Sequence, residues 1–490
     1  MIEKMENISV DYSKKWLVMA AVACEVFLST IDGSIVNIAL NTLVEQLHEP
    51  LAIVEWVVLA YLLVIATLML SIGRLADMFG KKKLFATGFA IFTIGSAFCG
   101  LSTNIYWLIA SRVIQAVGAS MNMALSTAII TEAFPDEERG KALGIIGLLV
   151  SLGVIAGPTL GGIILQYLTW HWLFFVNLPI GVIGFFMVLR FVPARKPKGD
   201  QKFDFWGAGT LFVGMASFLL ALSLIQTDGF QNKLVYGLLV FAVVMVALFL
   251  RAEKKASEPM IDLFLFTNRL FSINLITCFL TFVASAGVTL LIPLYLQNMM
   301  GFDPQKTGIL MIISPLAMAV AAPVSGAISD RVGSRVLTTI GLVISIIGYI
   351  SFIGLNEHTS TIVYILSYAA IGIGMGVFQS PNNSTIMGEA PKHRLGVASG
   401  LLSLTRVLGQ TVGISLLGAL WEANVFRFAG KIQVSDATQA PIPAQVAGLH
   451  DAMIFIVFFI LVAVFLSAWA LITVQRAKKH PKPDQELQTE

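Results

Sequence analysis

Long uninterrupted apolar segments are the feature of this 490-residue sequence that most limits how it can fold. Hydrophobic residues make up 57% of the chain and charged residues only 12%, about half of what a water-exposed surface needs. Fourteen apolar runs follow one another, and each can cross about 30 Å of hydrocarbon as an α-helix. The pattern predicts an all-α integral membrane protein with spans at 16–40, 54–72, 84–103, 105–130, 142–165, 172–192, 206–225, 234–250, 270–297, 307–328, 336–355, 361–381, 397–421 and 452–474.

The distribution of Lys and Arg predicts how these spans are oriented. With the N-terminus inside, the inner segments together with Arg190 at the inner end of the sixth span hold 26 of the 32 basic residues, the interiors of the spans hold 2 and the outer loops hold 4. Cytoplasmic loops carry the positive excess in membrane proteins. We therefore expect both termini on the cytoplasmic side of the inner or plasma membrane. The net charge of +3 reflects this bias, so no nucleic-acid partner is expected.

Several kinds of chemistry have no motif in this sequence. There is no G-x-x-x-x-G-K-[ST] phosphate loop and no H-E-x-x-H motif, and Cys24, Cys99 and Cys278 all fall inside predicted spans as small packing residues. We expect no enzymatic activity, no cofactor and no metal site, so that any transport is driven by an ion gradient or by the gradient of the substrate itself. The segment from Met1 to Lys15 runs directly into the first span, which predicts that this span is kept and not cleaved as a signal sequence.

Two charged segments share one pattern of glycine, aspartate, glycine and basic residues. GRLADMFGKKK occupies 73–83 between spans 2 and 3, and GAISDRVGSR occupies 326–335 between spans 10 and 11. The glycines of span 5 recur in span 13 at an offset of 256 residues, pairing Gly144, Gly153, Gly157 and Gly162 with Gly400, Gly409, Gly413 and Gly418. The chain is therefore predicted to contain two related halves.

The repeat predicts a domain organisation and a place for the substrate. We expect a six-helix bundle at 1–193, a linker with two inserted spans at 194–258, a second six-helix bundle at 259–475 and a cytoplasmic tail at 476–490. Two parallel repeats place the substrate at their interface near the bilayer midplane, and transport follows from rocking of one bundle against the other.

The charged segments are expected to act as gating contacts that form in one access state and break in the other. An aspartate can face the positive N-terminal end of a helix, and basic side chains can pair with acidic groups or lipid head groups. The alternative is that these residues only set the topology, above all Lys81–Lys83. The gating candidates of the two segments are Gly73, Arg74, Asp77, Gly80, Asp330 and Gly333.

Four ionisable residues lie well inside predicted spans: Glu25, Asp32, Arg112 and Arg406. A charge at the centre of a membrane helix costs about 2.5–3.5 kcal/mol on insertion scales, so each is a candidate functional residue. Glu25 and Asp32 are seven residues apart, which places them on one face of the first span and about 10 Å apart along its axis.

Asp32 is the expected proton carrier, because a partly desolvated carboxylate binds a proton more readily than one in water. Its structural alternative is a cap at a kink before Gly33. Glu25 is expected to contact a cationic substrate, with a water-facing position near the inner end as the alternative. Arg406 is also expected to contact the substrate. Further polar residues at membrane depth are expected to line the substrate site or to bond helices together: Asn37, Gln115, Asn122, Gln379, Asn382 and Asn383.

The charged loop at 73–83 resembles the signature loop of the major facilitator superfamily, and RVIQAVGAS (112–120) resembles its fourth-span motif. LGVIAGPTLGG (152–162) is similar to the fifth-span signature of that superfamily's antiporters. Five further segments resemble the fourteen-span drug:proton antiporter branch, the EmrB/QacA type: STIDGSIVNIAL (29–40), WHWLFFVNLPIG (170–181), FDFWG (203–207), PMIDLFLF (259–266) and PLYLQNMMGFDPQKTGIL (293–310).

The resemblance implies roles for several residues. It implies two six-helix bundles plus two inserted helices, a part for Arg112 in proton coupling, and an acidic first-span motif at Asp32. A structural bridge to backbone carbonyls is the alternative for Arg112. Some relatives carry acidic residues in span 13, where this sequence has Arg406 and Gln410, and this departure leaves the handling of divalent cations in doubt. The fifth-span signature implies a gating role, or simple close packing, for Gly153, Gly157, Pro158, Gly161 and Gly162.

Together these features predict a proton-coupled multidrug antiporter that exports hydrophobic, cationic compounds by alternating access. The partners are then small-molecule substrates, protons and membrane lipid, and the protein is expected to be a monomer. One alternative is a transporter dedicated to one metabolite class, such as an amino acid, sugar or siderophore. Another is a non-transporting membrane sensor. The segment 422–451 is expected to be an outer loop, with no role readable from its sequence.

Overall fold

The computed structural model describes residues 12–135, 138–194, 205–228, 232–255, 263–391, 395–430 and 436–479. Within these ranges the chain is helical with no strand, and fourteen stretches are long and apolar enough to span a membrane, which confirms the predicted all-α membrane architecture. The α-helices in chain order are α1 (Lys15–Ile35), α2 (Leu40–Leu47), α3 (Leu51–Val54), α4 (Trp56–Phe79), α5 (Lys81–Gly100), α6 (Ile105–Ala133), α7 (Arg139–Tyr167), α8 (Trp172–Phe175), α9 (Asn177–Phe191), α10 (Phe205–Asp228), α11 (Lys233–Lys255), α12 (Arg269–Leu294), α13 (Pro304–Met311), α14 (Ile313–Val332), α15 (Ser334–Ile353), α16 (Thr361–Glu389), α17 (Leu395–Ala429) and α18 (Ile442–Lys479).

Short helical turns complete several spans. The turn η2 (Val36–Ala39) joins α1 to α2, so the first span reaches Leu47 and is longer than the predicted 16–40. The π-helical turn η6 (Tyr295–Met299) extends α12. Three other turns are 3-10 helices outside the spans, namely η1 (Tyr12–Lys14), η5 (Leu263–Thr267) and η8 (Ala437–Gln439).

The expected outer loop at 422–451 is largely helical, and that prediction was wrong. Helix α17 continues to Ala429, and α18 begins at Ile442. A hydropathy criterion ends these helices too early because they carry polar residues near this end. Glu422 and Gln445 are such residues, yet both are buried between helices, each with 2% of its surface exposed.

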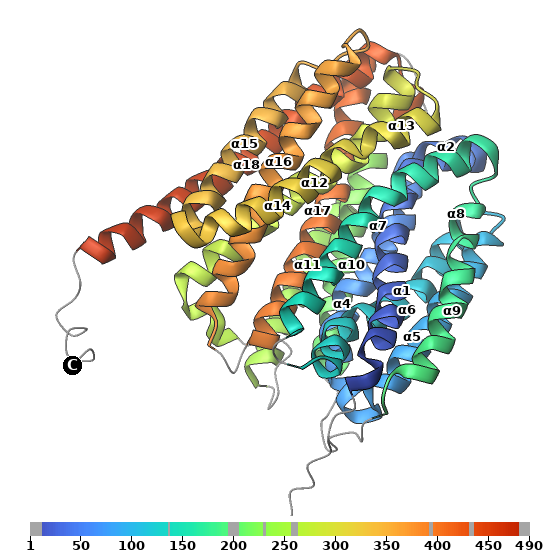
Figure 1. Ribbon diagram of the computed structural model, residues 1–490. Helices are drawn as coiled ribbons and strands as arrows, with labels where there is room; N and C mark the ends of the chain where they lie inside the picture. Colours follow the sequence, from blue (N-terminus) through green and yellow to red (C-terminus); the bar gives the residue numbers. More distant parts are fainter. Residues whose placement is uncertain are drawn as a thin grey trace, which may run out of the picture.

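The two halves of the chain repeat one packing pattern. In the first half α1 packs against α6, α7 and α9, and both α4 and α5 pack against α6. In the second half α12 packs in the same way against α16, α17 and α18, and both α14 and α15 pack against α16. Figure 1 shows the halves as two bundles, blue to green and yellow to red, leaning toward each other.

Helices α10 and α11 lie between the halves in sequence and pack against each other. Helix α10 also contacts α4 of the first half and α17 of the second, and the Trp56 indole Nε1 donates to Ser223 Oγ of α10 at 3.2 Å. The segments that flank this pair, 195–204 and 256–262, lie outside the described residues. The domain limits at 193 and 258 therefore stay predictions.

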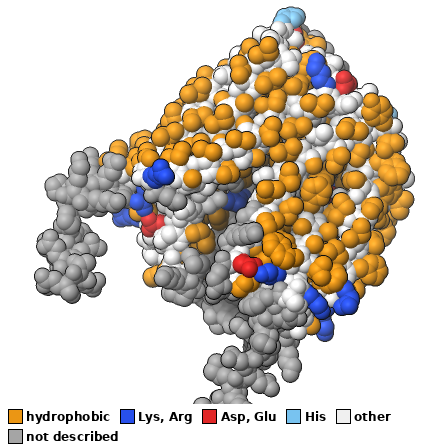
Figure 2. Space-filling model, in the orientation of Figure 1, with side chains coloured by type: hydrophobic (Ala, Val, Ile, Leu, Met, Phe, Trp, Pro, Cys, Tyr) orange, Lys and Arg blue, Asp and Glu red, His pale blue; other side chains and the backbone are white. Residues whose placement is uncertain are grey.

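The surface of the helical body is apolar, as a bilayer requires. Large side chains such as Leu148, Val243 and Phe465 are 60–70% exposed, and Figure 2 shows hydrophobic side chains covering most of the visible helical face. A soluble protein rarely exposes continuous apolar area on this scale. Most of the basic side chains visible in Figure 2 lie toward the end of the helical body where α1 begins in Figure 1. We call this the basic end, and the other the opposite end.

Polar contacts join the two halves at the opposite end. The Asn41 side-chain amide donates to Gln297 Oε1 at 3.4 Å, and Gln297 Nε2 donates to the Ile38 carbonyl at 3.4 Å. The backbone N–H of Leu51, at the start of α3, donates to Asp436 Oδ2 at 2.8 Å in a buried contact. The connection between α17 and α18 thus caps a helix of the first half.

Candidate functional site

A buried ion pair joins Asp32 of α1 to Arg112 of α6. Arg112 Nη1 donates to Asp32 Oδ2 at 2.6 Å, and the two side chains are 0% and 1% exposed, respectively. They are 80 residues apart in sequence, so only the packing of α1 on α6 brings them together. Removing either partner would leave a buried charge uncompensated, which makes the pair a point where protonation and structure are coupled.

Amide and hydroxyl groups complete the bonding of the pair. Gln115 Nε2 and Asn177 Nδ2 donate to Asp32 Oδ1 at 2.8 and 3.0 Å. Both amides also donate to Ser96 Oγ, at 3.2 and 3.1 Å. Arg112 Nη1 donates in turn to Gln115 Oε1 at 2.7 Å. Side chains of α1, α5, α6 and α9 therefore meet at one carboxylate, and we call these five residues the Asp32 cluster.

The Arg112 guanidinium also contacts backbone and aromatic groups. Its Nε donates to the Val57 carbonyl of α4 at 3.0 Å, and its carbon lies 4.0 Å from the centroid of the Tyr61 ring and 5.8 Å from that of Phe174. A cation over an aromatic face is attracted by the ring quadrupole. The bridge to a backbone carbonyl that was the alternative for Arg112 is present, together with its ion pair to Asp32.

The kink cap considered for Asp32 is not what the structure has. Helix α1 runs on through Gly33 to Ile35, and the hydrogen bonds accepted by the Asp32 oxygens come from the side chains of other helices. The local polar contact at this point belongs to Asn37, whose Nδ2 donates to the Gly33 carbonyl at 3.1 Å. Asn37 bonds to its own span and does not join the Asp32 cluster.

Sequence reasoning missed three residues of this site. Asn177 and Ser96 are buried polar residues inside spans, and they meet the same criterion that singled out Asn37 and Asn122. Asn177 also falls within the segment 170–181 that carried the family resemblance. Tyr61 had no signal of this kind, because an aromatic residue in an apolar span is ordinary until its ring is found beneath a guanidinium.

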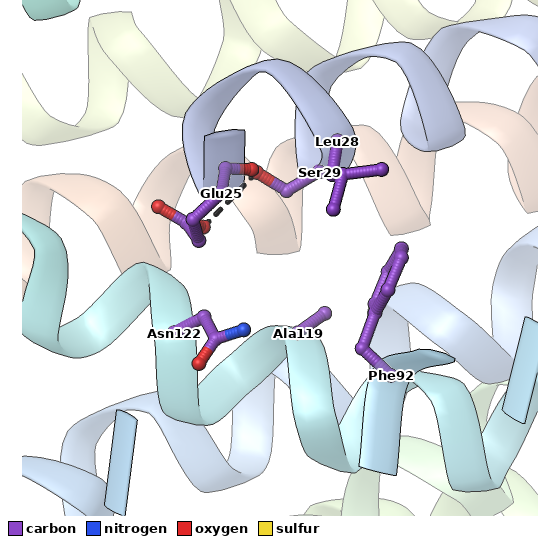
Figure 3. A pocket seen from close by; sticks show the side chains of 6 residues that line it. All are labelled: Glu25, Leu28, Ser29, Phe92, Ala119 and Asn122. Atoms are coloured by element: carbon purple, nitrogen blue, oxygen red, sulfur yellow. Dashed lines mark hydrogen bonds between the residues drawn. The ribbon is translucent and has the colours of Figure 1, made fainter. Parts of the chain in front are cut away.

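Glu25 lies in a separate small cavity on the same helix face. Its side chain is buried, Oε1 accepts from Ser29 Oγ at 3.1 Å, and Oε2 accepts from the Ser126 hydroxyl of α6. Among the described residues no Lys or Arg forms an ion pair with it, and the water-facing position that was the alternative for Glu25 does not hold. The cavity has about 10 Å³ of room for water, and its lining in Figure 3 is Glu25, Leu28, Ser29, Phe92, Ala119 and Asn122.

Asn122 lines that cavity but is also tied to the neighbouring helix. With its amide oriented so that both atoms are satisfied, Nδ2 donates to the Phe85 carbonyl at 2.9 Å and Oδ1 accepts from the Phe89 N–H at 3.2 Å. Its side chain also occupies the space where a Cβ on Gly88 would lie. Bonding between α5 and α6 accounts for these contacts.

The remaining polar candidates lie in the second half, away from the Asp32 cluster. Asn382 of α16 is fully buried, and its Nδ2 donates to the Asn274 carbonyl of α12 at 3.4 Å. Arg406 of α17 donates from Nη2 to Asn383 Oδ1 at 2.8 Å. Gln379 is half-buried on α16. The predicted substrate-binding set is therefore divided between the two halves.

The glycines of α7 form a face that lies directly against α1. A Cβ on Gly153 would lie 2.7 Å from Thr30 Cβ, and one on Gly157 would lie 1.9 Å from Ser34 Oγ. Gly161, one turn further on, meets Ile38 and Ile35 in the same way. Their spacing of four residues keeps them on one side of the helix. No larger side chain fits at this contact unless the helices separate.

A second face of the same segment contacts the other half of the protein. A Cβ on Gly162 would lie 2.4 Å from the Pro304 carbonyl oxygen at the start of α13, and one on Gly308 of α13 would lie 2.2 Å from the Pro158 carbonyl oxygen. Helix α7 is therefore packed between α1 of its own half and α13 of the other. The fifth-span segment is where the two halves touch backbone to backbone at the opposite end.

The two charged loops have the same backbone geometry at the basic end. Gly80 has φ 90° and ψ 131°, and Gly333 has φ 97° and ψ 133°. Residues other than glycine rarely adopt such positive φ values, which explains why glycine recurs at this point. Each turn directs the chain from one long helix into the next, α4 into α5 and α14 into α15.

A basic residue after each of these turns pairs with a glutamate near the end of the fourth membrane span of its half, which is α6 in the first half and α16 in the second. Lys81 pairs with Glu132 of α6, and Arg335 pairs with Glu389 of α16. Both pairs stay within one half and are partly exposed, so each contributes about 1 kcal/mol at most. The surroundings of Gly73 and the side chains of Arg74, Asp77 and Asp330 lie outside the described part of the structure, so these gating candidates stay predictions.

Two repeated six-span halves with two further spans between them in the described chain, and a buried ion pair inside one bundle, define a polytopic membrane transport protein. The chain belongs to the Major Facilitator Superfamily, whose family model matches residues 22–414. This confirms the family expected from the signature segments.

Relatives and solved structures agree with this assignment. The riboflavin transporter RibZ of Clostridioides difficile is 35% identical over 84% of this chain and 89% of its own. The multidrug transporter protein MdtP of Bacillus subtilis is 31% identical over 84% of this chain and 76% of its own. The crystal structure of the POT family transporter PepTSo has a TM-score of 0.68 at 17% identity and covers 95% of this chain and 98% of that one, a likeness of fold alone.

Proposed function

We propose that this protein is a proton-coupled exporter of hydrophobic compounds, including lipophilic cations, that works by alternating access. The observation that carries the proposal is the bonding of Asp32, a single buried carboxylate that meets a guanidinium and two amides from other helices. Relatives named as multidrug transporters, MdtP among them, support the drug-exporting assignment.

Protonation of Asp32 would change the forces on α1. A neutral carboxyl group loses its Coulomb attraction to Arg112, which keeps its bonds to Gln115 and to the Val57 carbonyl. Helix α1 is then free to shift relative to α6. Because α1 packs on the glycine face of α7, and α7 packs on α13, such a shift reaches the contact between the halves through a continuous set of packed helices.

The proposed direction follows from the distribution of basic residues, which places both termini in the cytoplasm. Protons then enter from outside and cargo leaves. One proton crossing about 100 mV releases about 2.3 kcal/mol, and one pH unit adds about 1.4 kcal/mol. This energy supports a gradient of several hundredfold for a neutral cargo, so one proton per cycle is adequate for a neutral compound.

The proposal is tested with purified protein in liposomes under an imposed pH gradient. Addition of ethidium to the wild type should produce proton movement opposite to dye movement, recorded with a pH-sensitive dye trapped inside. Liposomes without protein control for leak. If the folded protein moves ethidium at the same rate with and without a pH gradient, proton coupling is wrong; if it moves neither ethidium nor protons, multidrug export is wrong.

A second candidate is a carrier dedicated to one metabolite. The riboflavin transporter RibZ, at 35% identity, is the observation that favours this candidate. It predicts saturable uptake or release of riboflavin that unlabelled riboflavin competes with and that ethidium does not affect. The same liposomes distinguish the two candidates, because a multidrug exporter allows unrelated compounds to compete.

Replacing Glu25 by glutamine should weaken binding of the lipophilic cation tetraphenylphosphonium about 10- to 100-fold, the usual value of a hydrogen-bonded charge. Glutamine can accept from one of the Ser29 and Ser126 hydroxyls through its oxygen and donate to the other through its amide nitrogen, so the fold should persist. Equilibrium binding of the radiolabelled cation measures the effect. The control is Glu45→Gln, an exposed acid on the same span. Equal loss of a neutral dye such as Nile red would show that Glu25 is only structural.

A further inference from the structure

The two arginines inside the spans have opposite bonding environments. Arg112 has an ion pair, a side-chain amide, a backbone carbonyl and two aromatic rings around it. Arg406 donates to Asn383 Oδ1 at 2.8 Å, has the neutral Cys278 thiol beside it, and lies 5.7 Å from the centroid of the Phe282 ring. Within the described residues no carboxylate lies within ion-pair distance of Arg406.

Several buried polar atoms of α17 and α12, including one of Arg406, have no hydrogen-bond partner. Its own Nε has no hydrogen-bond partner, and neither has Asn274 Nδ2 on α12. Asn274 is 5% exposed and Asn382, bonded to its backbone, is fully buried. Buried donors without acceptors are rare in folded proteins, because each costs the desolvation of that group. Asn382, which is bonded to Asn274, carries an unpartnered acceptor of its own in Oδ1, so the free donor that fits an acceptor outside the chain is the Nε of the Arg406 guanidinium.

The internal repeat shows that Arg406 is not part of the shared scaffold. At the offset of 256 residues that relates α7 to α17, position 406 corresponds to Val150, an apolar residue that faces outward from its bundle. The same offset pairs Ser126, which donates to Glu25, with Asn382. The second half thus has an amide at Asn382 where the first half has a hydroxyl at Ser126, and the guanidinium of Arg406 has no polar counterpart in the first half.

We propose that Arg406, with Asn383 beside it, binds an anionic group of the transported compound, such as a carboxylate or sulfonate on a hydrophobic body. The inference rests on the proposed transport function and extends its cargo beyond cations. A guanidinium presents a planar fork that bonds a carboxylate through two parallel N–H groups. The charge would otherwise stay uncompensated at membrane depth, where charged side chains are rare and mark substrate or ion pathways.

The test is equilibrium binding of carboxyfluorescein to the full-length protein in detergent, with no gradient, followed by fluorescence anisotropy. We expect saturable binding to the wild type and about 10- to 100-fold weaker binding to Arg406→Gln, as for loss of a charged hydrogen bond. The control is Arg427→Gln, which removes the same charge from an exposed position on the same helix. Excess inorganic phosphate separates a site for organic anions from one that takes any anion.

A second variant guards against loss of folding. Asn383→Asp places a carboxylate at the atom that Arg406 already contacts, so it should neutralise the guanidinium and abolish dye binding while the protein stays folded. The proposal is overturned if folded wild type shows no saturable binding, if either variant binds as the wild type does, if Arg427→Gln loses as much, or if phosphate competes as well as the dye. Because no proton gradient is used, failure of proton coupling and failure of this site are distinguishable.

Discussion

Replacing Asp32 by asparagine should reduce ethidium-driven proton exchange in liposomes to the rate of liposomes without protein. Asparagine keeps the shape of the side chain and can still accept from Gln115 and Asn177, but it cannot take up a proton. Binding of ethidium without a gradient should remain, since Glu25 is untouched. Proton exchange at the wild-type rate in a folded Asp32→Asn protein would falsify the role of Asp32.

The same substitution should lower stability, because it leaves Arg112 as a buried charge without its carboxylate. Removing one partner of a buried ion pair costs about 3–5 kcal/mol. The double variant Asp32→Asn with Arg112→Gln removes both charges and should recover most of that loss in thermal unfolding, while proton exchange stays absent. Recovery of stability without recovery of transport separates the coupling role of the pair from its structural role.

Replacing Gly308 by leucine should open the protein at the opposite end. A Cβ at this position would lie 2.2 Å from the Pro158 carbonyl oxygen, and a backbone atom cannot yield as a flexible side chain can. Overpacking of this kind costs about 1–3 kcal/mol, which corresponds to a shift of about 5- to 150-fold in the population of the two access states. Transport should fall because the closed state is required once per cycle.

Spin labels at Gln46 and His358, exposed residues of the two halves near this end, measure the opening by double electron–electron resonance. Of the three free cysteines only Cys24 is half-buried, so only Cys24 needs prior replacement. The control is Gly147→Leu on α7, because a Cβ there meets nothing within 4 Å. A longer label distance in Gly308→Leu alone is expected; an unchanged distance would show that the α7–α13 contact does not hold the end closed.

Local pattern was enough for the elements of this fold. Apolar runs predicted all fourteen spans, since burying a helix in hydrocarbon depends on its own composition. Hydropathy failed to predict helix ends where polar side chains lie. Gln445 donates hydrogen bonds to the carbonyls of Thr438 and Ala440 inside the protein, so α18 begins earlier than its hydropathy indicates. Glycine at 80 and 333 was likewise readable, because a positive φ is a property of one residue.

The sequence did not show which residues bond to the charged side chains inside the spans. The cost of a charge in a membrane marks Asp32, Arg112 and Arg406 as unusual in the same way. Whether that cost is offset depends on which helix faces which, and the bonds to Asp32 come from residues up to 145 positions away. Tertiary packing alone decided that Arg112 meets a carboxylate and Arg406 an amide, because hydrogen bonds are short and directional whereas hydropathy is not.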